Sequence, residues 1–195
     1  MRIWCASANP HKVEEIARLM PHGVEMQPRP ADVGDIDEDA PSLEGNAVLK
    51  AVEIANHVHG WAIADDTGLE VAALGGEPGV RSARFAGQPP NDAANRALLL
   101  ERLQGVSDRS AVFRTVVALV NDKGEMHFLR GECRGVVADA ERGGNGFGYD
   151  AVFVPSDGDG RTFAEMTSAE KDAVSHRSRA LAQLPGLIDR LAGRA

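Results

Sequence analysis

The sequence predicts an α/β protein in which helices flank a long, mixed and partly antiparallel β-sheet. Near the start of the chain, a short apolar stretch that suits a buried strand (residues 2–8) is followed by a segment with helical spacing of apolar residues. Farther along, the β-rich residues 111–120 and 125–137 are separated by a tight turn, which indicates an antiparallel hairpin. A chain of 195 residues can form one substantial core or two lobes. We therefore expect a single domain over residues 1–195, with two lobes and a cleft between them.

The composition is that of an ordinary globular protein and excludes several classes of partner. The formal net charge is -8, which argues against a nucleic acid or an anionic membrane surface as partner. No apolar run is long enough to cross a bilayer, and the N-terminal residues lack the apolar region of an export signal. Cys5 and Cys133 lie far apart in the sequence, as expected of buried free thiols in a reducing compartment. We therefore expect a cytoplasmic protein.

The first candidate site follows the first predicted strand. Asn9 and Pro10 begin a helix, with proline at a favourable first-turn position. Ser7, Asn9 and Lys12 then lie where backbone N–H groups and the helix dipole favour an anion. Glu15 follows Lys12 by about one turn and can pair with it. The alternative is a capped amphipathic helix with solvated charges, because the segment is not a Walker-type glycine loop.

Carboxylates dominate the next two segments. Residues 28–42 form an acidic, proline-containing loop that is either solvated or a source of a metal ligand. Ser42 is expected to cap a helix that runs to about His59. In WAIADDTGLE, residues 61–70, a short apolar run predicts a strand that ends in a turn at Asp65 and Asp66. Neighbouring strand residues point to opposite faces, so we expect one of these carboxylates to hold a metal or a water and the other to stabilise the turn.

Glycine-rich segments come next. Residues 75–79 predict a tight loop that presents two arginines for ion pairing or phosphate binding, and residues 91–103 predict a helix. In RGGNGFGYDAVFVP, glycines surround Phe147, and Tyr149 and Asp150 precede an apolar strand. The aromatic ring can stack on a flat ring and the carboxylate can accept from ring N–H groups, or the ring can fill the core instead.

The last candidate segment contains a row of cations. Thr167 or Ser168 is expected to cap a turn with Lys171, and Ser175 to cap the final helix, which breaks at a later proline. His176 and Arg177 fall in the first turn of that helix, where positive charge opposes the helix dipole. This mild cost suggests that the two residues have another task.

Together, an anion-friendly turn, a pair of carboxylates and a glycine–aromatic loop predict a nucleotide site with Mg²⁺ as the metal. Here the sequence resembles the inosine triphosphatase-like pyrophosphatases, the dITP/XTP pyrophosphatase family, which hydrolyse non-standard purine nucleoside triphosphates. The resemblance covers nearly the whole chain and rests on several motifs in the same order. These are SANPHKVEE, Glu38 with the following NAVLKA, ADDTGLEV, GGEPGVRSARF, GFGYDAVF and TFAEMTSAEKDAVSHR.

The resemblance implies roles for individual residues. Asp66 matches the family's metal-binding carboxylate and general base, and Glu38, with Asp37 adjacent, falls where the family has a second acidic metal ligand. The substrate-contacting positions are Ser7, Ala8, Asn9, Pro10, His11, Lys12, Thr67, Phe147, Gly148, Tyr149, Asp150, Lys171, His176 and Arg177. Ser7 replaces the usual threonine, and Pro10 and His11 replace smaller residues.

The resemblance also implies the reaction and the assembly. ITP, dITP and XTP would be cleaved between the α and β phosphates to the monophosphate and pyrophosphate, by an elongated enzyme that forms a homodimer. Lys12 and Lys171 would neutralise the triphosphate. His176 and Arg177 would donate to the 6-oxo group, where adenine presents a donor instead. Two alternatives remain: a related pyrophosphatase for modified pyrimidine nucleotides, and a non-catalytic nucleotide-binding module.

Overall fold

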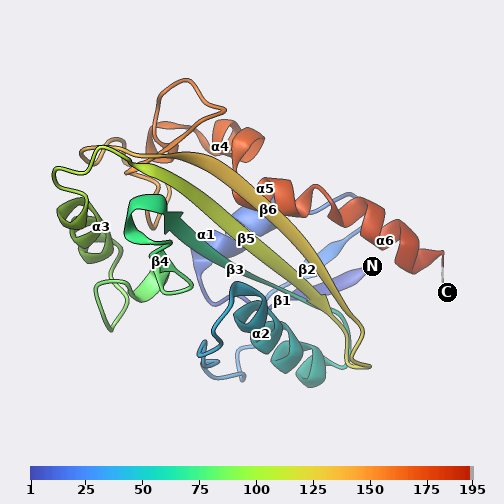
Figure 1. Cartoon of the computed structure of the whole chain (residues 1–195). Helices are drawn as coiled ribbons and strands as arrows, with labels where there is room; N and C mark the ends of the chain where they lie inside the picture. The colour runs from blue at the N-terminus through green and yellow to red at the C-terminus, as the bar shows by residue number, and fades with distance from the viewer. Residues whose placement is uncertain (194–195) are drawn as a thin grey trace. The chain divides into compact units, whose positions relative to one another are not determined.

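The computed structural model of the chain describes residues 1–193 and contains a mixed β-sheet with flanking helices (Figure 1). The helices are α1 (Pro10–Arg18), α2 (Leu43–Val58), α3 (Asp92–Arg102), α4 (Ser168–Val174), α5 (His176–Leu181) and α6 (Leu184–Ala192). The strands are β1 (Arg2–Cys5), β2 (Glu25–Gln27), β3 (Ala62–Val71), β4 (Pro78–Gly79), β5 (Ser110–Val120), β6 (Met126–Val137) and β7 (Phe153–Pro155). Short 3₁₀ turns lie at Ala72–Leu74, Ser82–Arg84 and Phe163–Glu165.

The strands form one sheet in the order β2-β1-β3-β5-β6-β7, with β4 paired to β3. Strand β1 runs parallel to β2 and β3, whereas β4 and β7 run antiparallel to β3 and β6. The predicted mixed sheet with flanking helices is therefore confirmed. None of the helices in the described chain is both long and apolar enough to span a bilayer.

The chain divides into two compact units. Unit 1 contains Met1–Asp66, Thr115–Gly131 and the chain from Arg177 onward, and unit 2 contains Thr67–Arg114 and Glu132–His176. Strands β3, β5 and β6 contribute residues to both. Two units agree with the predicted two lobes. Three expectations stay predictions: the elongated outline, the cleft, and the single domain. The predicted bounds of that domain, residues 1–195, extend beyond the described residues.

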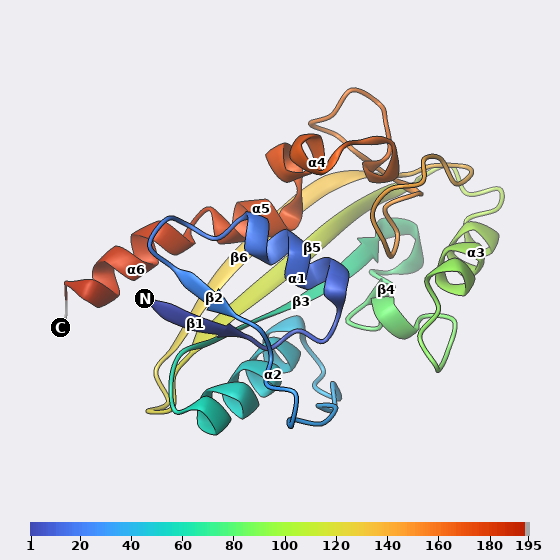
Figure 2. The ribbon, with the colours of Figure 1, turned by 180° about the vertical axis from the view of Figure 1, so that it is seen from behind.

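In unit 1, the sheet is covered on both faces. Ile63 of β3 belongs to a buried cluster with Ile16 of α1 and the apolar side chains of α5 and α6, whereas its neighbours Ala62 and Ala64 pack with α2. Strand side chains alternate between faces, so α2 covers one face and α1, α5 and α6 cover the other (Figure 2). The α2 face is rich in alanine, and small side chains let a helix approach a sheet closely.

In unit 2, aromatic rings form the centre of the core. Phe113 of β5 meets Phe153 of β7 edge to face, with ring centroids 4.7 Å apart, and Phe163 packs against both. Leu99 of α3 is fully buried in the same cluster. This core holds α3 and the glycine-rich residues 142–150 within one unit.

The predicted turn at Asp65 and Asp66 is wrong, because β3 runs without interruption from Ala62 to Val71. The glycine that suggested a turn serves strand pairing instead. A Cβ on Gly68 would lie 2.5 Å from the backbone oxygen of Gly79 in β4. Only glycine therefore permits the close approach of β4, and the two carboxylates lie in the middle of a strand.

Most predicted helix starts are confirmed. The side chains of Asn9, Ser42 and Thr167 accept backbone N–H groups at the starts of α1, α2 and α4. The predicted final helix is two helices, since α5 ends at Leu181 and α6 begins at Leu184 with Pro185 in its first turn.

Candidate active site

Asp65 and Asp66, adjacent residues of β3, bind charged groups on opposite faces of the unit 1 sheet. The Asp65 side chain lies on the face covered by α1 and α5, and the Asp66 side chain lies on the face covered by α2. Both residues are buried. The prediction that the two carboxylates have different surroundings is confirmed, and the alternation of strand side chains is its physical cause.

Asp65 is held by two cations. Its Oδ2 accepts from Arg177 Nη2 at 2.8 Å and lies 3.3 Å from Lys12 Nζ. Burial alone would raise the pKa of Asp65, but the charges of Lys12, Arg177 and Lys50 outweigh it and hold that pKa far below its usual range. Asp65 is therefore an anion fixed in a buried ion-pair network.

Arg177 completes this network and has a clear structural role. Its guanidinium is 1% exposed, and its Nη1 also donates to the carboxylate of Glu15 on α1. Arg177 was expected to have a task besides its place at a helix start, and its ion pairs with two buried carboxylates are such a task. Glu15, expected to pair with Lys12, forms an ion pair with Arg177.

On the other face, Asp66 lies against α2. Asn46 Nδ2 donates to Asp66 Oδ2 at 3.1 Å, and Lys50 Nζ lies 3.6 Å from Asp66 Oδ1 and 3.0 Å from Glu38 Oε1. Burial raises the pKa of Asp66, an effect that Lys50 opposes. Burial would lower the pKa of Lys50, but the carboxylates of Asp66, Asp65 and Glu38 raise it, so the ammonium stays charged.

The donor set on this face fits a hard divalent cation. Glu38 and Asp66 are near enough to share one ammonium, and carboxylate oxygens are the ligands that Mg²⁺ prefers. Within residues 1–193, no group of three or more His, Cys, Asp or Glu side chains is placed to hold a metal. A metal held here would therefore take its remaining ligands from water and phosphate, as Mg²⁺ usually does.

Side chains of the N-terminal turn cap its own backbone N–H groups. Asn9 Oδ1 accepts from the backbone N–H groups of His11 and Lys12 at 3.0 and 3.4 Å, and Ser7 Oγ accepts from the N–H of Asn9 at 3.2 Å. Side chains thus already occupy donors that an anion would use. The charge of Lys12 remains as the attraction for an anion at this turn.

In unit 2, the glycine–aromatic loop Phe147–Asp150, hereafter the aromatic loop, is tied by one buried carboxylate. Asp150 Oδ2 accepts from the Phe147 N–H at 3.0 Å and from Lys171 Nζ at 2.6 Å. The same ammonium lies 5.0 Å from the centroid of the Phe147 ring. Lys171 is 4% exposed, so its place in this structure is beside the loop, and its predicted contact with the triphosphate stays a prediction.

Tyr149 and His176 are built into the core of unit 2. The Tyr149 hydroxyl donates to the backbone oxygen of Ser82 at 2.9 Å, and burial, aided by the charge of Asp92, raises its pKa well above the usual range. The His176 ring stacks on Phe113 with centroids 4.5 Å apart and an interplanar angle of 14°. Both side chains therefore support the fold beside the aromatic loop.

The predicted site residues are divided between the two units. Unit 1 contains Ser7, Ala8, Asn9, Pro10, His11, Lys12, Glu38, Asp66 and Arg177, and unit 2 contains Thr67, Phe147, Gly148, Tyr149, Asp150, Lys171 and His176. Sequence reasoning missed Asn46 and Lys50, which contact Asp66. Their signal was present: a polar pair at i and i+4 on the buried, alanine-rich face of a predicted helix.

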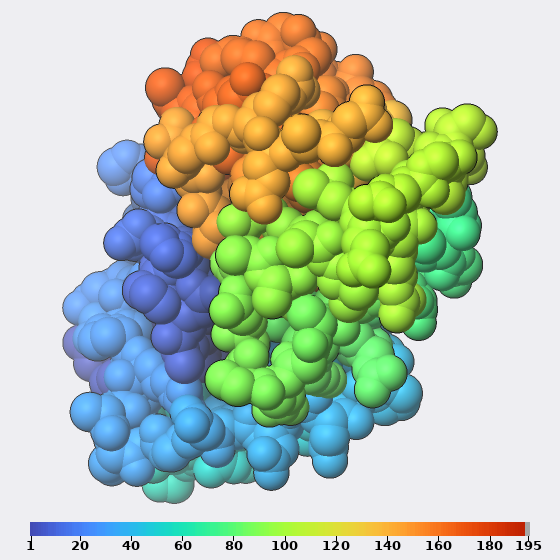
Figure 3. All heavy atoms as spheres, turned by 90° about the vertical axis from the view of Figure 1, so that its left-hand side faces the viewer, coloured from blue at the N-terminus to red at the C-terminus, as the bar shows by residue number. Residues whose placement is uncertain are grey.

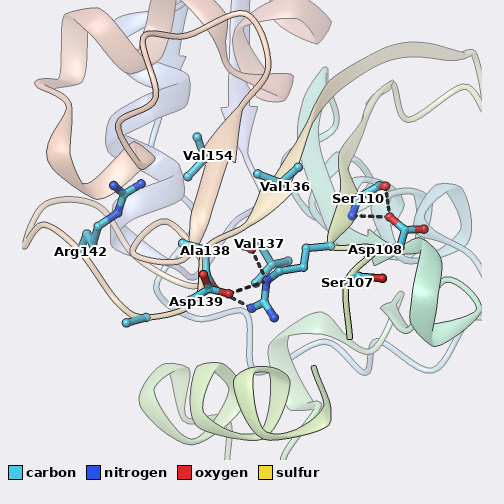
Figure 4. Close-up of a pocket in the computed structure, with 11 residues that line it drawn as sticks. Ser107, Asp108, Ser110, Val136, Val137, Ala138, Asp139, Arg142 and Val154 are labelled. Atoms are coloured by element: carbon cyan, nitrogen blue, oxygen red, sulfur yellow. Dashed lines mark hydrogen bonds and ion pairs between the residues drawn. The ribbon is translucent and has the colours of Figure 1, made fainter. Parts of the chain in front are cut away.

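One cavity in unit 2 contains none of the predicted residues. It has a volume of about 700 Å³ and is lined by side chains that include Arg109, Val136, Asp139, Arg142 and Val154 (Figure 4). Arg109 donates to the backbone oxygens of Leu103, Val137 and Ala138 and pairs with Asp139. The Arg109 donors are engaged by backbone oxygens and by Asp139, so we assign no substrate to this cavity.

Comparisons with known proteins agree over almost the whole chain. The model of the Ham1 family matches residues 3–186. A dITP/XTP pyrophosphatase of Porphyromonas gingivalis is 47% identical over 183 residues, which cover 92% of this chain and 93% of that protein. A dITP/XTP pyrophosphatase of Bacillus licheniformis is 44% identical over 190 residues, covering 94% of this chain and 96% of that protein. A HAM1 protein structure from Coxiella burnetii covers 97% of this chain and 99% of its own, with 39% identity and a TM-score of 0.87.

Proposed function

This chain belongs to the Ham1 family, and we propose that it hydrolyses non-standard purine nucleoside triphosphates (ITP, dITP and XTP) to the monophosphate and pyrophosphate. The observation that carries the proposal is the pair of adjacent carboxylates on β3, each held by a lysine. Hydrolysis of a nucleoside triphosphate needs cations to offset the phosphate charge and a carboxylate to accept a proton from the attacking water. Asp66 with Lys50, and Asp65 with Lys12, supply both in unit 1.

We assign the triphosphate end of the substrate to the carboxylate pair of β3. Lys12 and Lys50 lie on either side of the carboxylate pair and offset phosphate charge. Nucleotide pyrophosphatases generally need a divalent metal ion, and we propose that Glu38 and Asp66 hold Mg²⁺. When bound, such an ion would offset the negative charge that builds up on the leaving pyrophosphate.

Asp66 is the residue we assign to the attacking water. Its carboxylate orients the water and accepts a proton as the water oxygen bonds to the α-phosphorus. The bond from the α-phosphorus to the bridging oxygen breaks, and the electron pair leaves with pyrophosphate. The Asn46 amide donates to one oxygen of Asp66, and this hydrogen bond fixes the orientation of the carboxylate.

We assign the purine base to the aromatic loop. The Phe147 ring offers a stacking surface, and Asp150 can accept from base N–H groups. Discrimination against ATP follows if His176 or Arg177 donates to the 6-oxo group, because adenine presents a donor at that position. We also propose that the enzyme works in the cytoplasm, where free thiols such as Cys5 and Cys133 stay reduced, and that it forms a homodimer, as the family resemblance implies.

The test is a panel of ITP, dITP, XTP, GTP, ATP and a modified pyrimidine triphosphate, each with and without Mg²⁺. We expect the 6-oxo purine nucleotides ITP and XTP to react well above ATP, with pyrophosphate and monophosphate as the first products and no activity after chelation of the metal. A diphosphate and orthophosphate as first products would overturn the proposed reaction. A preference for the pyrimidine nucleotide would overturn the proposed substrate class.

A further inference from the structure

Helix α3 presents a row of polar side chains to two loops of unit 2. Asn95, which is 2% exposed, donates from Nδ2 to the backbone oxygen of Ala83 at 2.9 Å and accepts from the N–H of Ala86 at 2.7 Å. Asp92 and Arg96 are spaced i and i+4, so they lie one above the other on the same helix face. This face of α3 therefore binds backbone groups of neighbouring loops.

Asp92 and Arg96 bind the two polar backbone groups of a single residue, Gly148, in the aromatic loop. Asp92 Oδ2 accepts from the Gly148 N–H at 2.7 Å, and Arg96 Nη1 donates to the Gly148 carbonyl oxygen at 2.9 Å. The guanidinium is held in turn by Glu141, whose Oε2 lies 3.0 Å from Arg96 Nε. We call Asp92 and Arg96 the Gly148 clamp.

The clamp acts at the point where the aromatic loop has an unusual backbone. Gly148 has a φ of +59°, in the left-handed region, and a Cβ there would meet nothing within 4 Å. Glycine adopts this conformation without strain, and the two hydrogen bonds from α3 hold both polar backbone groups of Gly148 in place. In the space-filling view, the yellow-orange segment that contains the loop lies against the green segment where α3 begins (Figure 3).

The orientation of the Phe147 ring depends on this backbone. Phe147 directly precedes Gly148, and its own N–H is bound by Asp150, so the loop is tied at both residues. Asp150 is held by Lys171 of α4, and Gly148 is held by Asp92 and Arg96 of α3. Tyr149 anchors the loop in the buried cluster that contains Leu99, and the clamp adds a direct link from Gly148 to α3.

We propose that Asp92 and Arg96 are positioning residues for the purine base: they hold Gly148 so that the Phe147 ring is placed for stacking before the substrate arrives. This rests on the proposed function, which assigns the base to the aromatic loop. A preorganised loop does not have to be ordered during binding, so the clamp improves affinity for the base. Neither residue touches the reacting phosphate in this assignment, so we expect an effect on KM and not on kcat.

The substitutions Asp92→Ala and Arg96→Met each remove one hydrogen bond of the clamp. We expect KM for ITP, and the inhibition constant of IMP, to rise about three- to tenfold, the equivalent of one lost hydrogen bond. We expect kcat to change less than twofold. Inhibition by inorganic tripolyphosphate, which has no base, should stay at the wild-type value.

Three variants serve as matched controls. Asp92→Asn keeps an oxygen that can accept from Gly148 while removing the charge at the helix start, so it separates the hydrogen bond from the helix dipole. Glu141→Gln weakens the ion pair with Arg96 and leaves the Gly148 contact. Arg102→Met removes another arginine of α3, one that pairs with Glu77 and does not contact the loop. All three should have near wild-type KM values.

Amide hydrogen exchange gives a readout that does not depend on activity. Exchange at Gly148 should be faster in Asp92→Ala than in Asp92→Asn or the wild type, even if the enzyme proves to act on another substrate. Wild-type protein that releases no pyrophosphate from ITP would overturn the proposed function alone. Clamp variants that match Arg102→Met in KM and in exchange would overturn the clamp. The clamp proposal would also be overturned if the variants lost IMP and tripolyphosphate binding equally, or if both failed to fold. Either result would give the clamp a role in the fold only.

Discussion

Replacing Arg177 with methionine should destabilise unit 1 strongly, because it removes the cation at the centre of a buried network. The guanidinium donates to Asp65 through Nε at 3.2 Å and Nη2 at 2.8 Å, and to Glu15 through Nη1. Arg177 is 1% exposed, so water cannot take its place without rearrangement. The substitution leaves two buried carboxylates, of which Asp65 keeps an ion pair with Lys12 at 3.3 Å.

The expected size follows from the cost of breaking a buried ion pair. Removing one partner of such a pair typically costs about 3–5 kcal/mol, because an uncompensated charge stays buried. For a chain of this length, each kcal/mol lowers Tm by about 2–4 °C. We therefore expect Tm to fall by about 6–20 °C.

The assay is thermal and urea unfolding of Arg177→Met beside Arg130→Met. Arg130 is a matched control, because it also belongs to unit 1 and its Nε donates to Glu44 at 3.1 Å, but its side chain is 61% exposed. Exposed pairs contribute about 0–1 kcal/mol, so this variant should unfold close to the wild type. Adding Glu15→Gln to Arg177→Met should recover part of the loss, since it removes one of the stranded charges.

Equal stability of the two arginine variants would refute this reasoning. It would mean that Asp65 and Glu15 are neutral in the folded protein, or that water reaches them. A loss of ITP-to-ATP discrimination on replacing Arg177 would then report a direct contact of Arg177 with the base. Because Arg177 also holds Asp65 and Glu15, any loss of discrimination has to be compared with the loss of stability.

The other predictions concern the site and one exposed ion pair. Asp66→Asn should fold normally and lower turnover by about 10²–10⁴-fold, and near wild-type hydrolysis of ITP would remove Asp66 from the mechanism. Phe147→Ala should raise KM for ITP with little change in tripolyphosphate inhibition; equal losses for both probes would place the ring away from the base. Glu170, whose pKa is lowered to about 2 by hydrogen bonds from Arg161 and the Thr167 N–H, should stabilise the fold above its unfolded pKa near 4.5 and lose that contribution as the pH falls toward 2. The difference in Tm between wild type and Glu170→Gln should therefore shrink across this range, and a constant difference would contradict the shift.

The sequence predicted the elements well where local signals and tertiary packing agree. Asn9, Ser42 and Asn91 precede helices that begin within one residue of them, because their side chains cap free N–H groups. The apparent turn after Asp66 failed for the opposite reason. Thr67 and Gly68 have the composition of a turn, but the pairing of β4 with β3 requires a glycine inside the strand.

The site could be predicted as a set of residue types but not as a set of contacts. The order of motifs identified Lys12, Asp66 and Arg177, yet no local pattern states that Arg177 meets Asp65, a residue 112 positions away in the chain. The Gly148 clamp was missed for the same reason, since Asp92 lies 56 positions from Gly148. Such pairs are set by the packing of elements, which sequence periodicity does not specify.

The surroundings of Asp65 and Asp66 explain why the chemical role falls on the second carboxylate. Asp65 lies between Lys12 and Arg177, which hold its pKa far below the usual range, so it binds a proton poorly and serves as the counter-ion of the network. Asp66 has a pKa raised by burial, and its neighbours are an amide and one lysine that it shares with Glu38. A base has to accept a proton near neutral pH, so the carboxylate with the higher pKa is the better candidate. If that assignment is correct, Asp65→Asn should lower stability more than Asp66→Asn and turnover less, and the reverse ranking would exchange the two roles.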